Sequence, residues 1–111
     1  MEPDSTITPF EQLNWYANRV IARMVSDGAI SPHDRTQALE RLLGFEEDSY
    51  ESFSVPDSAV NPYPYFAADR TLIKAGLLKT RLVTDLERRF RFERYPTHEG
   101  IRALINGSLD S

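Results

Sequence analysis

The chain has 111 residues, the length of one domain, with a formal net charge of −4 at pH 7. Its 41% apolar and 27% charged residues are ordinary for a globular protein and exclude a disordered chain. It has no cysteine, which excludes disulfides, cysteine nucleophiles and cysteine-based zinc sites.

The start of the chain and its longest apolar runs carry no membrane signal. Residues 1–10 lack the basic and apolar regions of a signal peptide. No apolar run approaches the roughly 18 residues that a membrane span requires. We therefore expect a cytoplasmic protein with no membrane contact.

The charge is distributed unevenly. Residues 31–60 hold two basic and seven acidic side chains, whereas residues 61–111 hold nine basic and six acidic ones. This polarity is the most informative feature of the composition.

The sequence predicts two helices at the start of the chain. The first begins in a capping box, with Thr8 as N-cap, Pro9 next and Glu11 at the third position, and ends at Gly28. We predict that the second begins with Ser31 as its N-cap and ends at Gly44. Helices joined by about four residues must fold back or cross, so we expect a helical hairpin or corner here.

The first helix carries an apolar stripe at helical spacing that is expected to face the core. Its members are Phe10, Leu13, Ala17, Val20, Ile21 and Met24.

Residues 45–63 are predicted to form a long irregular loop, which is acidic between residues 46 and 51 and rich in proline near its end. Tyr63, Tyr65 and Phe66 follow around the last prolines. These aromatic residues suit either a docking segment or a lid over the core.

Helical signals resume from Tyr65 to a break near Gly76. Apolar residues then recur every fourth position from Leu78 to Phe90, which predicts the longest helix over residues 77–94. The alternation over residues 89–92 is typical of a short strand instead, but no partner for it is apparent. Thr97 is predicted to cap a last short helix that ends at residues 106–107.

These elements predict an all-α fold, a single domain of four to five short helices over residues 8–106. Residues 1–7 and 107–111 are expected to be flexible tails.

Neither catalytic chemistry nor a cofactor is indicated. His33 and His98 have no second ligand at helical spacing, so no metal site is predicted. Residues 27–34 resemble half of a calcium-binding loop, but Arg23 and Val25 stand where its first ligands would be. We predict no catalytic, cofactor-binding or metal-binding residues.

Two surfaces are predicted to bind a partner. Trp15 lies roughly opposite the apolar stripe of the first helix, with Ala22 on the same side. It is covered either by the segment 45–66 or by another protein. Arg81, Arg88 and Arg91 share one side of the predicted long helix.

The favoured function is that of a non-catalytic interaction protein, namely a regulator, adaptor, immunity protein or inhibitor that binds another protein. A homodimer is the related alternative. A nucleic-acid-binding regulator that uses the arginine face is less favoured because the protein is acidic. A small enzyme that uses a histidine is the last alternative. The predicted partner-binding residues are Trp15, Ala22, Arg81, Arg88, Arg91, Tyr63 and Tyr65.

Overall fold

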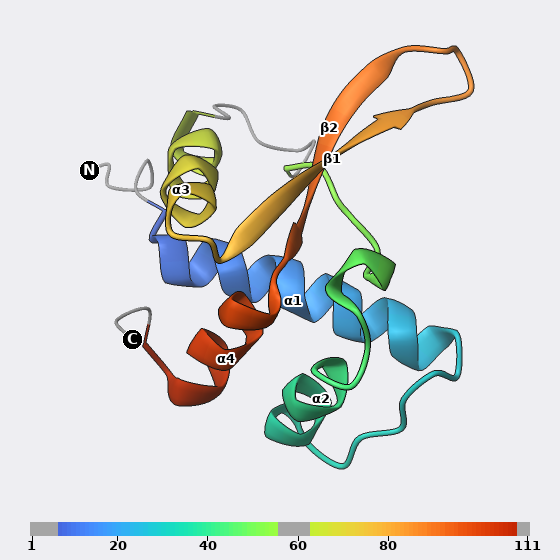
Figure 1. Cartoon of the computed structure of the whole chain (residues 1–111), viewed down its shortest axis with the longest axis vertical. Helices are drawn as coiled ribbons and strands as arrows, with labels where there is room; N and C mark the ends of the chain where they lie inside the picture. Colours follow the sequence, from blue (N-terminus) through green and yellow to red (C-terminus); the bar gives the residue numbers. More distant parts are fainter. Residues whose placement is uncertain (1–6, 56–62, 109–111) are drawn as a thin grey trace.

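The computed structural model describes residues 7–55 and 63–108. The long helix α1 (Pro9–Ser26) lies at the centre, and the other main elements pack around it (Figure 1). These are α2 (Arg35–Leu42), α3 (Tyr63–Lys74), the strands β1 (Leu78–Thr84) and β2 (Phe90–Pro96), and α4 (His98–Asn106). A one-turn 3-10 helix, η2 (Glu47–Ser49), follows α2. Residues 1–6 and 109–111 of the predicted tails lie outside the described residues.

The fold is α+β, so the all-α prediction is wrong. Residues 78–96 form an antiparallel two-stranded hairpin instead of the predicted long helix. The apolar residues recur every four positions, which suggested a helix. Because side chains of a strand alternate between two faces, residues four positions apart also lie on one face of a strand. β-branched residues in β1 and aromatic residues in β2 favour strands. The partner missing for residues 89–92 is the segment directly before them.

The hairpin turn is built by Asp85. Its carboxylate accepts hydrogen bonds from the Glu87 N–H at 2.8 Å and the Arg89 N–H at 2.9 Å. The Asp85 N–H donates to the Arg89 carbonyl at 3.0 Å. Arg88 adopts a left-handed backbone with φ of 62°. An aspartate that bonds its own backbone in this way fixes the chain reversal.

Two of the three predicted N-caps are confirmed. The Thr8 capping box is present, and the Thr97 hydroxyl accepts from the Gly100 N–H at 3.0 Å. The second helix begins later than predicted, because Asp34 and not Ser31 is its N-cap. The Asp34 carboxylate accepts from the Gln37 N–H at 2.8 Å, while the Gln37 side chain accepts from the His33 N–H at 2.7 Å. This reciprocal pair outcompetes the start that Ser31 offers.

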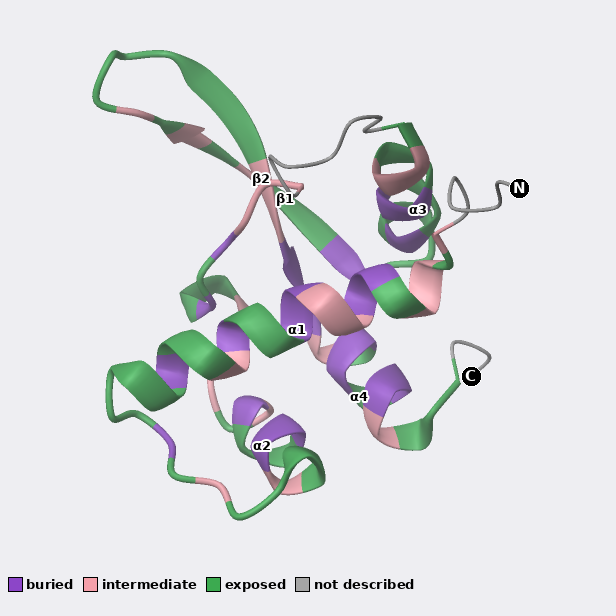
Figure 2. Cartoon of the chain, turned by 180° about the vertical axis from the view of Figure 1, so that it is seen from behind, coloured by how far each residue is buried: buried purple, intermediate pink, exposed green. Residues whose placement is uncertain are grey.

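The core lies between α1, α2, α4 and the base of the hairpin (Figure 2). The predicted loop contributes to it, since Tyr50 is buried and its hydroxyl donates to the Leu42 carbonyl at 2.6 Å. The buried apolar side chains include Leu13, Tyr16, Ala17, Val20, Leu39, Leu42, Leu72, Leu78, Ile101 and Leu104.

Gly100 marks the closest approach between α4 and the chain before β1. A Cβ atom at this position would lie 2.3 Å from the Leu77 carbonyl oxygen and 3.1 Å from a methyl group of Leu13. Alanine normally stabilises a helix relative to glycine by about 1 kcal/mol. We expect Gly100→Ala to lower the free energy of unfolding instead, by about 1–3 kcal/mol, because the helix must move away. Urea denaturation measures this, and Arg102→Ala on the exposed side of α4 should change it by less than about 0.5 kcal/mol.

Candidate interaction surface on the β-hairpin and helix α3

The distal half of the hairpin projects from the helical body as an arm (Figure 1) and is largely exposed (Figure 2). It carries large apolar side chains that the rest of the described chain leaves uncovered. Leu82 is 55% exposed, Phe92 58%, Phe90 70% and Leu86 103%. We call these four residues the hairpin apolar cluster.

The strand register gathers three of these side chains on one face. Leu82 pairs with Phe92, and Thr84 pairs with Phe90. Directly opposed residues of an antiparallel pair point to the same face, so Leu82, Phe90 and Phe92 lie together. Leu86 lies in the turn at the end of this face. An apolar patch of this kind on a small protein is typical of an interaction site.

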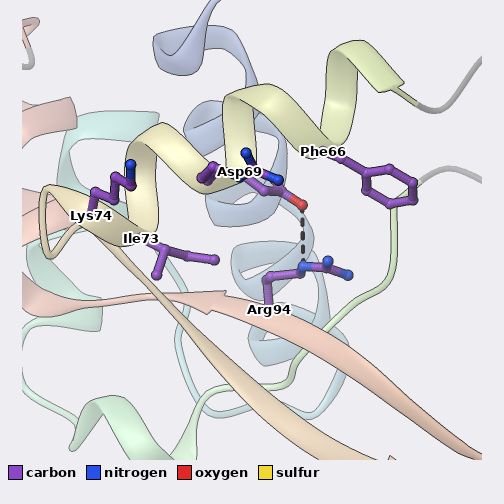
Figure 3. Close-up of a pocket in the computed structure, with 6 residues that line it drawn as sticks. Phe66, Asp69, Ile73, Lys74 and Arg94 are labelled. Carbon is purple, nitrogen blue, oxygen red and sulfur yellow. Dashed lines mark ion pairs between the residues drawn. The ribbon is translucent and has the colours of Figure 1, made fainter.

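Asp69 of α3 holds the base of the hairpin, on the face that carries Leu82, Phe90 and Phe92. Asp69 is 2% exposed and accepts hydrogen bonds from Gln12 Nε2 at 2.9 Å and from the Tyr16 hydroxyl at 3.0 Å. Its Oδ2 also lies 3.1 Å from Nε of Arg94, on β2 (Figure 3). This cluster joins α1, α3 and the hairpin in one buried polar contact.

Burial sets the ionisation of this cluster. It raises the pKa of the Asp69 carboxyl, against the opposing effects of the Gln12 hydrogen bond and the Arg94 charge. Burial and the neighbouring carboxylate also raise the pKa of the Tyr16 hydroxyl, which therefore stays protonated and donates.

The opposite face of the hairpin base rests on η2. Lys79 forms an ion pair with Glu47, whose carboxylate also accepts from the His98 N–H at 2.8 Å. These hydrogen bonds lower the pKa of Glu47, so its charge is retained at neutral pH. The Arg81 guanidinium donates to the Asp48 carbonyl at 2.7 Å and the Tyr50 carbonyl at 2.8 Å.

One edge of β2 is also covered near its base. Phe53 and Arg94 exchange two backbone hydrogen bonds, at 2.9 and 2.8 Å. The hairpin is therefore fixed on two faces and one edge at its base, while its distal half is free of such contacts in the described part of the chain.

A groove of about 670 Å³ lies between α3 and the base of the arm. Its lining residues are Phe66, Asp69, Arg70, Ile73 and Lys74 of α3 together with Arg94 of β2. Arg94 links this groove to the hairpin apolar cluster, because its guanidinium lies 5.9 Å from the Phe66 ring and donates to the Phe92 carbonyl at 3.0 Å. The groove and the cluster thus adjoin on one side of the molecule.

Trp15 is half-buried against its own chain. Its ring meets Tyr16 edge-on at 5.0 Å, and the Arg19 guanidinium lies 5.3 Å from it and 5.1 Å from the Phe53 ring. Part of the segment predicted to cover Trp15 therefore does approach it, through Arg19. Ala22 is exposed and lines a smaller hollow of about 350 Å³ between α1 and α2.

The segment is a hairpin and not a helix, so Arg81, Arg88 and Arg91 share no helix face. Arg81 and Arg91 lie instead on one face of the hairpin, and Arg88 lies in the turn. Arg81 is engaged with backbone carbonyls and lies 4.3 Å from the Tyr95 ring. Arg91 pairs with Glu93 at 3.0 Å. The Arg88 side chain, in the turn, has no partner among the residues that the structure describes.

The two predicted tyrosines lie in the first turn of α3. Tyr63 is exposed and Tyr65 is half-buried. The hairpin apolar cluster was not predicted from the sequence. The alternation of arginine and phenylalanine over residues 89–92 was the available signal.

The two histidines lie in different surroundings. His33 is exposed, and Nε2 of His98 donates to the Phe45 carbonyl at 2.7 Å. Within residues 7–55 and 63–108, no three metal-ligating side chains gather, and no helix is long and apolar enough to cross a membrane.

Comparison with family models, curated proteins and solved structures finds no match to this chain. The function of this chain is therefore inferred from the chemistry of its own surface.

The ion pair between Asp69 and Arg94 should make the effect of an Arg94 substitution on stability depend on pH. Arg94→Met leaves Asp69 buried without its cation, so we expect the free energy of unfolding to fall by about 3–5 kcal/mol at neutral pH. Losing the cation raises the Asp69 pKa further above its ordinary value of 3.8. The decrease in the free energy of unfolding should be largest above the pKa that Asp69 has in the folded variant. It should become smaller as the pH falls below that pKa, since the neutral carboxyl tolerates burial.

Chemical denaturation at several pH values measures this loss. The double variant Asp69→Asn with Arg94→Met has no carboxyl to titrate at this site, so its difference from wild type should not show the same recovery in acid. A loss for Arg94→Met that is equal at neutral and acidic pH would contradict the assignment.

Proposed function

We propose that this chain is a non-catalytic binding protein that docks its projecting hairpin onto another protein, as a regulator, adaptor, immunity protein or inhibitor does. The observation that carries the proposal is the hairpin apolar cluster, four exposed large side chains on an arm that is fixed at its base. A fixed arm loses little conformational freedom when it binds, which favours affinity. Phenylalanine and leucine side chains supply the apolar area that the centre of an interface buries.

The charge around the arm favours an acidic partner over a second copy. Residues 63–96 hold eight basic and four acidic side chains, a local balance of +4 in a chain of net charge −4. A symmetric dimer uses the same patch on both copies. Contact through this face would therefore bring two cationic regions together, which costs energy. A different protein with an acidic, partly apolar surface fits better.

Nucleic acid is favoured less than protein. Arg89 already pairs with Asp85 at 3.2 Å and with Glu87 at 2.7 Å. These carboxylates would repel phosphates. Phe90 and Phe92 could stack on bases, but the other two members of the cluster, Leu82 and Leu86, offer no ring for this.

Neither histidine supports an enzymatic role, since His33 is exposed and the His98 ring is engaged with a backbone carbonyl. We assign the chain to the cytoplasm, because the absence of cysteine suits a reducing compartment.

The proposal is tested by removing the apolar rings while keeping the strand. Phe90→Thr with Phe92→Thr retains β propensity and should change the free energy of unfolding little, because both rings are exposed. In quantitative affinity capture from the cells that produce the chain, we expect one protein to bind the double variant roughly 30-fold less than wild type, as for an interface hot spot. Val25→Thr is the matched control, since Val25 is 47% exposed on α1.

The partner must bind wild type and Val25→Thr equally. If every captured protein is retained equally by the three chains, the proposal is wrong. If sedimentation shows a homodimer that the two threonines abolish, or if single-stranded nucleic acid is retained in their place, the corresponding alternative replaces it.

A further inference from the structure

The groove beside α3 combines apolar walls with unpaired positive charge. Phe66, Arg70, Ile73 and Lys74 follow one another at intervals of four, three and one residues, so they lie along one side of the helix. Phe66 is 39% exposed and Ile73 38%. In Figure 3 the side chains of Phe66 and Ile73 lie at separate places along the groove. Asp69 comes between them on α3, and Arg94 faces Asp69 from β2.

Of the three cationic side chains that line the groove, one forms an ion pair with a carboxylate. Arg94 is paired with Asp69, but its buried Nε–H does not point well enough at the carboxylate to form a hydrogen bond. Arg70 and Lys74 are exposed, and neither side chain has an acidic partner among the residues that the structure describes. The only carboxylate that lines the groove, Asp69, is already matched by Arg94. The groove therefore presents two uncompensated positive charges.

The size of the groove suits a short peptide segment. Its volume of about 670 Å³ falls in the range of sites that hold a ligand of a few side chains. Phe66 and Ile73 provide apolar contact for such side chains, and Arg94 continues the surface to the hairpin apolar cluster.

We propose that this groove binds an extended peptide segment of the partner that presents apolar side chains and aspartate or glutamate side chains on the same face. The inference rests on the proposed function, because it names the chemistry of the segment that the arm and α3 receive together. Arg70 and Lys74 are four residues apart on a helix, about 5–6 Å between Cβ atoms. Carboxylates two residues apart on an extended chain are separated by about 6.6 Å, which matches that distance.

An anionic ligand without apolar groups fits less well. Phosphate groups would satisfy Arg70 and Lys74 but would leave Phe66 and Ile73 exposed. Burial of both kinds of side chain requires a ligand that carries both kinds of group.

A random peptide display library tests the inference without knowledge of the partner. Selection on the wild-type chain should enrich peptides that combine apolar residues with Asp or Glu. A selected peptide, made synthetically with a fluorescent label, should bind about tenfold more weakly to Arg70→Glu with Lys74→Glu. Raising the salt concentration from about 0.05 M to about 0.5 M should weaken its binding to wild type, since salt screens exposed ion pairs.

Two further variants test whether the loss of peptide binding is caused by the charges of the groove. Arg70→Gln with Lys74→Gln removes the charges without reversing them and should give an intermediate loss, which guards against misfolding of the reversed variant. Arg41→Glu is the matched control, because Arg41 is an exposed arginine in the last turn of α2, away from α3 in both overall views. It should leave peptide binding unchanged.

The outcomes distinguish this inference from the proposed function. Selected peptides without acidic residues, or peptides that bind the charge-reversed variant as well as wild type, overturn the inference. The hairpin function then still stands if a captured partner depends on Phe90 and Phe92. Peptide binding that depends on Arg70 and Lys74, with no partner that depends on Phe90 and Phe92, supports the groove and overturns the hairpin function. Retention of labelled single-stranded RNA that depends on both cations, in place of peptide, assigns the groove to nucleic acid.

Discussion

The buried carboxylate of Asp69 is the contact on which the arrangement of the hairpin depends. A carboxylate that is 2% exposed is costly unless its oxygens are satisfied, and three partners from two other elements satisfy it here. Gln12 and Tyr16 come from α1, and Arg94 comes from β2. Any rotation of the hairpin relative to the helices would separate Arg94 from Asp69 and leave the buried carboxylate without its cation. The contact therefore specifies the direction in which the arm projects.

The hairpin is divided into a fixed base and an exposed end. Glu47 and the η2 carbonyls hold the face opposite Asp69, so the base is enclosed by polar contacts. The apolar side chains are placed beyond these contacts, where the described chain offers nothing to cover them. Polar contacts thus position the arm, and apolar surface at its end supplies the affinity that we propose.

Helix ends were easier to predict from the sequence than the class of the segment 77–96. Thr8 and Thr97 were identified because a cap depends on residues three positions apart. Ser31 was the predicted cap of the second helix, but the hydrogen bond from the Gln37 N–H to the Asp34 carboxylate sets the start of that helix three residues later. The spacing of Leu78, Leu82 and Leu86 fits a helix and a strand equally, so the choice depended on pairing with residues 90–96. The candidate site was missed for the same reason, because the exposure of Phe90 and Phe92 is set by where the arm projects.

An arm with open strand edges also bears on solubility in the crowded cell. Within the described residues, the outer edge of β2 is paired only at Arg94, so the outward-facing backbone groups of Phe90 and Phe92 are open to an extended chain. Phe90 lies between Arg89 and Arg91, and Phe92 lies between Arg91 and Glu93. Charged residues beside apolar ones on an edge strand oppose the stacking of like strands into aggregates. The charged residues that flank the two rings in the sequence are therefore expected to oppose fibril formation.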